Sequence, residues 1–512
     1  MPRARAEAKP ESRLRRKDTK ESLDSEKKRS SSPAAVTETR TSKRQRVETA
    51  KPAAKPVAKP TTKAAAAKPA SKPAPKAAEA PAANAKPKAV KPLKAASSKI
   101  IEPDLNPLPK SPVPSRPALT VFIWGASDSG QLGLGERMDE VPRPKPHPWV
   151  KENILKGTFG TEPGAGIVTV TSGGLHTYLL DEAGNVWSSG TNDEGALGRE
   201  TKKDPSDNEP DLRANHYAVI KGLNDDEFRA TRLAAGDNFG AALGEKGELK
   251  VWGTFRDDEG KSSFSSDVKK QLLPTSVSVL GRTTARSRYD PISSITGGEN
   301  HLVALTTRGE VYSWGIGGSG QLGRRVLVRH KQDALVPQRV VLGIRARKAV
   351  LIGAGLRATF AVDEAGEVWA WGMNSVGQLG IGERGDGVSQ PTRLPVLSPA
   401  NLDGDRVVQV EGGEFHTLFL TEQGRVYACG ACNDFQLGIP EEHEAFGGKG
   451  TRGAECVAEP VLVPLPAAVE GDPVVGISCG PRYNMAVTKE GVLLSWGVGL
   501  QGCGEEGGQL GG

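Results

Sequence analysis

A glycine that ends a strand-like apolar run recurs seven times in this chain, usually directly after an aromatic residue. Successive glycines lie 57 to 67 residues apart, which leaves room for about four short strands and a long loop. A sheet of that size cannot bury both faces alone, so it must stack against its neighbours. We therefore predict an all-β, seven-bladed β-propeller whose turns and loops carry the function. The glycines are Gly125, Gly190, Gly253, Gly315, Gly372, Gly430 and Gly497.

The residues before these glycines form one hairpin, repeated. In "HLVALTTRGEVYSWG" from His301 and "HTLFLTEQGRVYACG" from His416, two apolar runs flank a tight turn that contains glycine. This pattern is typical of antiparallel strands joined by a turn whose glycine has a positive φ. Six hairpins are complete, whereas "LTVFIWG" at residues 119–125 supplies only the second half of a seventh.

The last blade is therefore expected to be incomplete. The chain ends at "GQLGG", residues 508–512, and no further "GGxHT" segment supplies the missing half of the hairpin. We expect six full blades and a partial seventh with an exposed strand edge. We also expect the sequence to be truncated or mis-spliced at its C-terminal end.

Composition separates a tail from the repeat region. Residues 1–118 contain no Phe, Tyr or Trp and carry 29 Lys and Arg against 11 Asp and Glu, a net charge of +18. Such a segment cannot bury enough apolar surface to offset the entropy lost on ordering, so we expect a disordered basic tail rich in Lys, Pro and Ala. Residues 119–512, the predicted propeller, carry a net charge of −11, since the whole chain carries +7.

The sequence gives no sign of a membrane or secretory segment, since it has no apolar N-terminal run and no stretch of about 18 uncharged apolar residues. Five cysteines make an odd number, which argues against a disulfide framework. Cys429 and Cys432 match a redox or metal-binding spacing. However, Cys429 occupies a position that other repeats give to tryptophan in a buried strand, and no second pair follows. We expect no metal and no cofactor.

Several motifs resemble the regulator of chromosome condensation family over residues 119–512. They are "GQLGLGE" at Gly130, "TNDEGALGRE" at Thr191, "WGTFRDDEG" at Trp252 and "GQLGRR" at Gly320. The resemblance implies a guanine nucleotide exchange factor for the nuclear GTPase Ran, which acts by binding and needs no covalent catalysis. It also implies a protein that is bound to chromatin in the nucleus and supports nucleocytoplasmic transport and mitotic organisation.

One repeat departs from the others after Trp252, where charged residues replace the usual G-Q-L-G turn. Taken alone, this is a tolerated insertion in a surface loop. The resemblance implies instead a wedge that projects into Ran near its phosphate-binding loop. The residues of the expected wedge are Phe255, Arg256, Asp257, Asp258, Glu259, Gly260 and Lys261.

The turns that precede each hairpin recur in register and should cluster on one face of the ring. The recurring His176, His301 and His416 have two interpretations: each imidazole fixes its own turn, or some of them contact the GTPase. A shared zinc site is the weakest option, because the three residues belong to non-adjacent blades. The resemblance adds further GTPase-binding positions, including two where this chain departs from the family pattern. The additional positions are Asp128, Asp237, Asn300, Arg324 and Phe415, and the departures are Asn300 and Phe415.

Basic segments suggest further partners. "KKR" and "KRQR", separated by 13 residues, resemble a bipartite signal for a nuclear import receptor. Spaced lysines without aromatic residues suit neutralisation of DNA phosphates. The resemblance also implies that a basic loop contacts core histones of the nucleosome. The residues are Lys27, Lys28, Arg29, Lys43, Arg44 and Arg46 for import, and Arg325, Arg329 and Lys331 for chromatin.

Three functions therefore compete. The wedge and the tail together favour a chromatin-bound Ran exchange factor. Asn300 and Phe415 keep open a chromatin-associated adaptor that has no exchange activity. An enzyme built on a propeller has no support from a Ser-His-Asp order, a metal ligand set or a phosphate-binding loop.

Overall fold

The computed structural model describes residues 104–135, 140–201, 213–225, 227–277, 291–344, 346–447 and 456–498. These belong to one compact unit, Ala96–Gly512, which is separate from the unit Met1–Ala95. Strands dominate the described part, as predicted, and no helix within it is long and apolar enough to cross a bilayer. Its helical segments are α1 (Pro148–Leu155), η1 (Val328–Leu335), η2 (Pro395–Leu397), η3 (Glu444–Phe446) and η4 (Ala467–Val469).

Each full blade is an antiparallel sheet whose strands follow the chain from the inner to the outer edge. The first blade is β3 (Ile167–Ser172), β4 (His176–Asp181), β5 (Val186–Gly190) and β6 (Ala218–Val219). The second is β7 (Ala230–Ala235), β8 (Phe239–Gly244), β9 (Leu249–Gly253) and β12 (Gln271–Ser276), and the third is β13 (Ile292–Gly297), β14 (His301–Thr306), β15 (Val311–Gly315) and β16 (Gln338–Val340).

The fourth blade is β17 (Ala349–Ala354), β18 (Ala358–Asp363), β19 (Val368–Asn374) and β20 (Gly385–Leu394). The fifth is β21 (Val407–Gly412), β22 (His416–Thr421), β23 (Val426–Ala431) and β24 (Cys456–Leu462). The sixth has three described strands, β25 (Val474–Cys479), β26 (Tyr483–Thr488) and β27 (Leu493–Gly497). A separate pair consists of β1 (Phe122–Gly125) and β2 (Val141–Pro146), and a small hairpin of β10 (Phe255–Arg256) and β11 (Ser262–Ser263).

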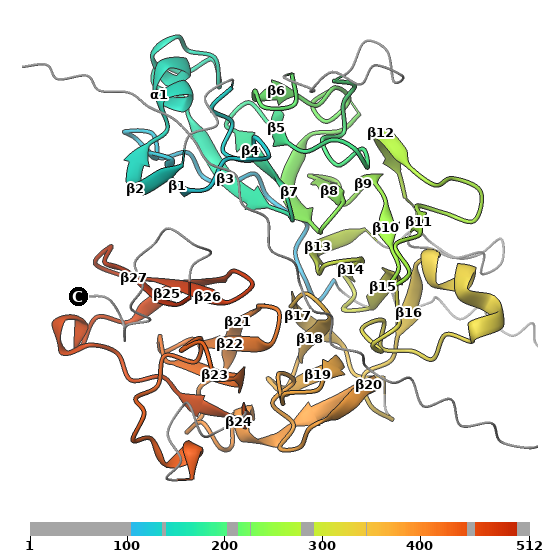
Figure 1. The fold of residues 1–512 in the computed structure, drawn as a ribbon, viewed down its shortest axis with the longest axis vertical. Helices are drawn as coiled ribbons and strands as arrows, with labels where there is room; N and C mark the ends of the chain where they lie inside the picture. Colours follow the sequence, from blue (N-terminus) through green and yellow to red (C-terminus); the bar gives the residue numbers. More distant parts are fainter. Residues whose placement is uncertain are drawn as a thin grey trace, which may run out of the picture. The chain divides into compact units, whose positions relative to one another are not determined.

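The blades stack radially, and the core lies between them. The inner strands β3, β7, β13, β17, β21 and β25 contact one another in that order (Figure 1). One apolar cluster illustrates the stacking: Val303 and Leu305 of the third blade pack with Ala361 and Trp371 of the fourth. Each blade therefore completes the core of its neighbour, which confirms the predicted propeller architecture.

The recurring glycine has a steric cause. Gly315 ends β15 with a φ of +118°, and a Cβ there would collide with the carbonyl oxygen of Asn300, which directly precedes β14. The same collision, with the corresponding carbonyl, would occur at the repeat glycines in the third strands of the other five blades. Only glycine combines this dihedral with so close an approach of the backbone.

The β1–β2 pair corresponds to the third and fourth strands of a blade. Like β5, β9, β15 and β27, β1 ends at a glycine of the repeat, Gly125. The His147 N–H donates to the Val121 carbonyl, just as the Ile220 N–H donates to Val186 in the first blade. Three prolines are tolerated in β2 because it is an outer strand. Within the described residues, no strand pairs with the inner side of β1.

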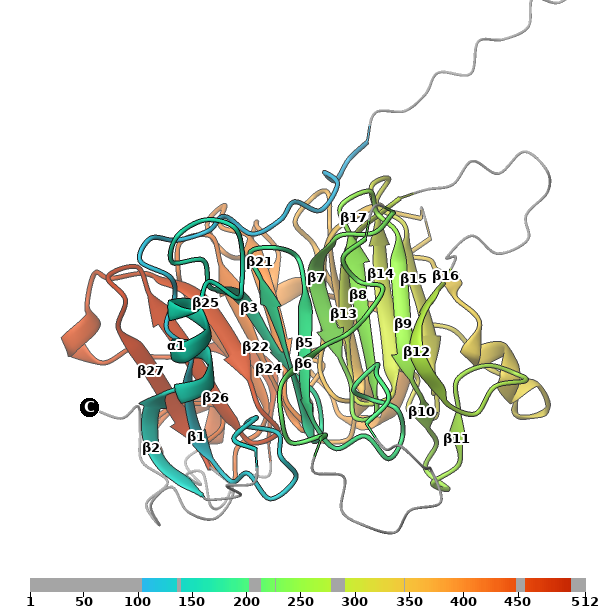
Figure 2. The same ribbon diagram turned by 90° about the horizontal axis from the view of Figure 1, so that it is seen from above.

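Residues 104–118 are bound to the propeller, so the predicted tail boundary at residue 118 is wrong. Asn106, which is buried, donates from its side chain to the carbonyls of Thr306 and Ala349, and its N–H donates to Thr307. At the other end, Arg116 forms a bidentate ion pair with Glu182. We call residues 104–118 the strap, which runs along one face of the ring (Figure 2). The remainder of the predicted tail lies outside the described residues.

Asn106→Ala is expected to lower the free energy of unfolding by about 2 kcal/mol, because it leaves two buried carbonyls without their donor. Urea unfolding followed by tryptophan fluorescence measures the change. Lys110→Ala, on the exposed middle of the same strap, is the matched control and should change the stability by less than about 0.5 kcal/mol. Equal stability of the two variants would contradict an anchoring role for Asn106.

Candidate functional site

The expected binding residues lie at one end of the blades. Each second strand pairs with the third strand so that its first residue faces the repeat glycine, as His301 faces Gly315. The loops before the second strands and the segments after the third strands therefore share one face of the ring. The strap contacts the opposite end, at Thr306 and Thr307, and Figure 2 shows β10 and β11 on the side away from it.

Backbone hydrogen bonds join the loops of this face from blade to blade. The N–H of Asp237 donates to Glu299 at 2.7 Å, and the N–H of Glu299 donates to Leu356 at 2.8 Å. Similar bonds run from Gly174 to Gly236, from Leu356 to Gly413 and from Glu414 to Pro481. This belt fixes the loops as one surface, so each loop is held by its neighbour as well as by its own blade.

The belt carries both acidic and basic side chains. Glu299 pairs with Arg357 at 2.7 Å, and Arg357 also pairs with Asp258 at 3.3 Å. Burial, together with the charge of Glu299, raises the pKa of Asp237. Arg482 lies near Glu414 and Asp434, at 3.8 and 3.6 Å. The predicted positions Asp237 and Asn300 thus lie on the belt, whereas Arg357 and Arg482 are basic members that sequence reasoning missed, although they recur in register with Asn300.

The predicted wedge is a preformed turn on this face. β10 and β11 pair, and the Asp257 side chain accepts from the N–H groups of Glu259 and Lys261 at 3.1 and 2.9 Å. Gly260 permits the turn with a φ of +78°. Asp258, Glu259 and Lys261 are exposed. The wedge therefore presents a charged tip whose backbone shape is fixed by its own hydrogen bonds.

Two predicted contact residues instead hold the wedge in place. Phe255 is 1% exposed, and its ring centroid lies 4.9 Å from that of Phe239 and 6.4 Å from that of Phe264. Asn300 is buried, and its side-chain oxygen accepts from the Arg256 N–H at 2.8 Å. The expectation that these two side chains form the binding surface is corrected by their burial, because they anchor the base of the wedge.

His301 and His416 have a structural role that differs from the predicted one, because their side chains bond to the neighbouring blade and not to their own turns. His301 Nε2 lies 2.9 Å from Thr359 Oγ1, and His416 Nε2 lies 2.7 Å from Asn484 Oδ1, so each imidazole joins its blade to the next. The Thr359 hydroxyl donates to the Gln321 carbonyl, and the Asn484 amide N–H donates to the Gln436 carbonyl. The oxygens of both side chains therefore accept a hydrogen bond from the histidine N–H. Both imidazoles are buried and do not reach the surface of the face.

The remaining predicted GTPase-binding positions are dispersed. Asp128 is exposed after β1, and Phe415 is half-buried on the belt. Arg324 is directed at loop carbonyls of Asp333 and Ala334, both 3.4 Å away, and burial lowers its pKa. Arg324 therefore organises the loop that contains η1.

The predicted chromatin-binding residues Arg325, Arg329 and Lys331 are exposed on the loop around η1. Lys331 lies 3.9 Å from Glu259, so this basic loop adjoins the tip of the wedge. The predicted import residues, 27–29 and 43–46, lie outside the described part of the chain. Cys429 is buried within β23, as expected from its position in the repeat.

Comparisons with known proteins agree with this geometry. The model of the RCC1-like domain matches residues 120–511. A guanine nucleotide exchange factor of Saccharomyces cerevisiae, SRM1, is 32% identical over 407 residues, covering 74% of this chain and 78% of its own. The crystal structure of yeast Prp20p, reported with its binding properties to Gsp1p and histones, has a TM-score of 0.61 at 29% identity and covers 77% of this chain and 83% of its own. The structure of Kap60 bound to yeast RCC1 (Prp20) also has a TM-score of 0.61, at 30% identity, covering 77% and 80%.

Proposed function

This chain belongs to the RCC1-like family, and on that premise we propose that it is a guanine nucleotide exchange factor that accelerates GDP release from Ran. The observation that carries the proposal is the wedge, a rigid charged turn at residues 256–261 on the face formed by the inter-blade loops. Such a turn is absent from the other described blades, where residues of the repeat follow the third strand.

The proposed mechanism is displacement by binding. An exchange factor that binds the nucleotide-free GTPase more tightly than the nucleotide-bound form must weaken nucleotide binding by the same factor. Asp258 and Glu259, at the tip, bring negative charge to a site that otherwise holds phosphate and a cation. Asp237, Glu299 and Arg357 supply a polar surface beside the tip, with backbone positions that the belt fixes in advance. Less ordering is therefore required on binding.

The direct test is release of a fluorescent GDP analogue from purified Ran, with excess unlabelled nucleotide, in the presence and absence of this protein. We expect acceleration that saturates with protein concentration. The alternative function, an adaptor without exchange activity, predicts that Ran binds while its release rate stays at the spontaneous value. Asn300 and Phe415, which depart from the family pattern, would favour the adaptor only if they changed the surface that contacts Ran. Asn300 is buried, so it does not change that surface.

We further propose that the exchange factor works on chromatin in the nucleus. The support is the net charge of +18 on residues 1–118, the import-like spacing of its basic clusters, and the exposed Arg325, Arg329 and Lys331. A yeast relative has been solved bound to Kap60, and its structure was reported with its binding properties to Gsp1p and histones. On the basis of this relative, we propose nucleosomes and an import receptor as partners of this chain.

Deleting residues 1–103, which leaves the strap intact, is expected to remove nuclear accumulation and most DNA affinity while exchange is retained. The full-length protein should lose DNA affinity steeply as salt rises, because each neutralised phosphate releases about one counterion. Fluorescence anisotropy of a labelled duplex at 50 to 200 mM salt, approximately, gives the two slopes. A deletion variant with the slope of the full-length protein would show that these residues do not bind DNA.

A further inference from the structure

Two arginines of the belt occupy the same place in two different blades. Arg357 directly precedes the second strand of the fourth blade, and Arg482 directly precedes that of the sixth. Arg357 pairs with Glu299, in the equivalent loop of the third blade, at 2.7 Å. Arg482 pairs in the same way with Glu414 of the fifth blade, at 3.8 Å. The two arginines therefore make matching ion pairs between neighbouring blades, and their surroundings can be compared directly.

The second carboxylate beside each arginine comes from a different part of the chain. Beside Arg482 it is Asp434, 3.6 Å away, four residues after the repeat glycine of the fifth blade. The third blade has Ser319 at this position, and the two turns share a hydrogen bond, because each of these residues donates its N–H to the side chain of the glutamine two residues later. Arg357 instead has its second carboxylate from the wedge tip, where Asp258 lies 3.3 Å away. Asp258 thus takes the place of a turn aspartate.

The turn of the third blade leaves room for this contact. A Cβ on Gly318 would lie 2.9 Å from Asp258 Oδ2, closer than nonbonded atoms of this kind approach. The fifth blade has Asn433 at the position of Gly318, three residues after its repeat glycine. A glycine and an uncharged serine in the third blade therefore open the place where the wedge tip reaches across that blade to an arginine of the fourth.

The pair of Arg357 and Asp258 is tighter than the neighbouring ion pair at the tip. Lys331 lies 3.9 Å from Glu259, and these two side chains are 63% and 78% exposed. Arg357 is 38% exposed and is already held by Glu299. An arginine that one carboxylate has fixed loses little further freedom when it pairs with a second, and its planar fork suits two acceptors. Arg357 is therefore preorganised to hold the tip.

We propose that Arg357 is a positioning residue for nucleotide exchange: it holds Asp258 and so fixes the wedge tip over the third blade before Ran binds. This inference rests on the proposed exchange function and identifies the group that sets where the acidic tip stands. Because the tip is ordered in the free protein, less conformational entropy is lost when the complex forms. Removal of the Arg357 side chain should therefore lower the rate of GDP release through the tip, while the propeller stays folded.

A double-mutant cycle separates positioning from direct contact with Ran. Arg357→Ala should lower the maximal rate of GDP release by about 5-fold, which is the upper limit for an exposed ion pair. In the Asp258→Ala background the same change should lower the rate by less than about 2-fold, because the arginine has no carboxylate of the tip to hold. Arg482→Ala, which changes the matching arginine beside Asp434, should lower the rate by the same factor in both backgrounds. Arg357→Lys should restore part of the rate, since it keeps the charge.

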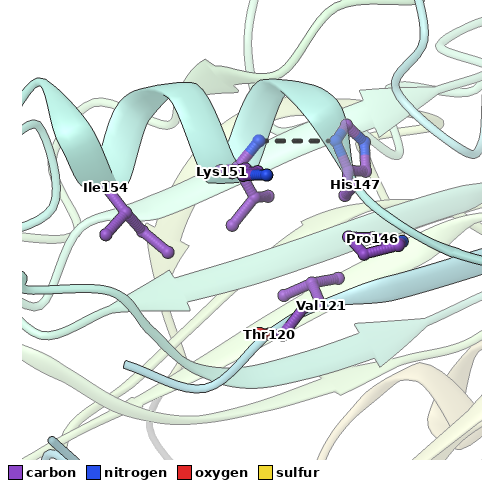
Figure 3. A pocket seen from close by; sticks show the side chains of 7 residues that line it. Thr120, Val121, Pro146, His147, Lys151 and Ile154 are labelled. Carbon is purple, nitrogen blue, oxygen red and sulfur yellow. Dashed lines mark hydrogen bonds between the residues drawn. The ribbon is translucent and has the colours of Figure 1, made fainter. Parts of the chain in front are cut away.

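A second variant displaces the tip without changing either partner of the ion pair. Ser319→Asp gives the third blade the turn carboxylate that Asp434 supplies in the fifth, so it competes with Asp258 for Arg357. It should lower the maximal rate of GDP release, and its effect should vanish in the Asp258→Ala background. The control for a charge change on the surface is Lys151→Ala, because Lys151 is exposed on α1 beside a small pocket (Figure 3). This control should leave the rate unchanged.

Amide hydrogen exchange in the free protein tests the positioning without Ran. The N–H groups of Glu259 and Lys261, which donate to Asp257, should exchange with solvent about 5-fold faster in Arg357→Ala, and at the wild-type rate in Arg482→Ala. The melting temperature of each variant checks that it is folded. Unchanged hydrogen exchange in the wedge of Arg357→Ala, or an equal loss of GDP release with and without Asp258→Ala, overturns the inference. If the wild-type chain does not accelerate GDP release, the proposed function fails, and hydrogen exchange alone decides whether Arg357 positions the tip.

Discussion

Replacement of the wedge tip, residues 257–261, with a Gly-Ser turn is expected to lower stimulated GDP release by on the order of 100-fold, toward the spontaneous rate. The tip holds Asp258 and Glu259, the exposed acidic groups proposed to enter the nucleotide site. The replacement keeps Phe255, which belongs to the core with Phe239, and it keeps the hydrogen bond from Arg256 to Asn300. The propeller should consequently stay folded, and nucleotide release from Ran measures the effect.

A matched control is a Gly-Ser replacement of the exposed residues Glu422 and Gln423, in the turn between β22 and β23 at the opposite end of a blade. It should leave exchange unchanged. Asp237→Ala should have an intermediate effect, because a belt residue contributes only part of an interface. Full exchange activity in a folded wedge variant would remove the basis of the proposed function.

The second prediction with a large expected effect is a loss of folding stability at acidic pH. Burial lowers the pKa of His176, His301 and His416 to about 4, from an ordinary value near 6.5. Protonation of His301 and His416 would place a hydrogen on a buried Nδ1 that has no partner among the described residues. The unfolded chain binds these protons near pH 6.5 and the folded chain only near pH 4, so stability is lost as pH falls between these values.

Glu411 opposes part of this loss. Burial raises its pKa to about 7, so the folded chain holds this proton between about pH 7 and 4.5, where the unfolded chain has released it. For these four groups, three histidine protons less one carboxyl proton leave about two, which corresponds to a fall of about 5 kcal/mol in the free energy of unfolding between pH 6.5 and 4.5.

Urea unfolding at a series of pH values measures the slope. The His416→Gln variant keeps a side-chain N–H for Asn484 but cannot titrate, and it should reduce the slope by about one proton. A slope identical to that of the wild type would mean that His416 does not govern the acid sensitivity.

The sequence predicts the blades well because their signal is steric and local. Gly315 and its counterparts mark where a strand passes close to a carbonyl, and no other residue meets that requirement. The position of the wedge follows from the same regularity, since it begins where the repeat is interrupted after Gly253. The family resemblance supplied its proposed partner.

Other features depend on contacts that no local pattern reports. Asn106 anchors the strap through carbonyls some 200 and more residues away, although its segment has the composition of a disordered tail. The family resemblance places Phe255 in the charged wedge, but its ring enters the core between blades. The three prolines of β2 are untypical of a strand, so the sequence does not indicate one there. The strand forms because it lies at the outer edge, where proline is tolerated. In each case tertiary contacts override composition.

The anchor of the wedge is an amide. Asn300 accepts the Arg256 N–H with an oxygen that does not titrate in the acid range, whereas an aspartate at this position would weaken as an acceptor when it gained a proton. Acidification should thus leave the attachment of the wedge unchanged until the histidines unfold the ring. The anchor of the wedge therefore adds no titration of its own to the pH profile of exchange.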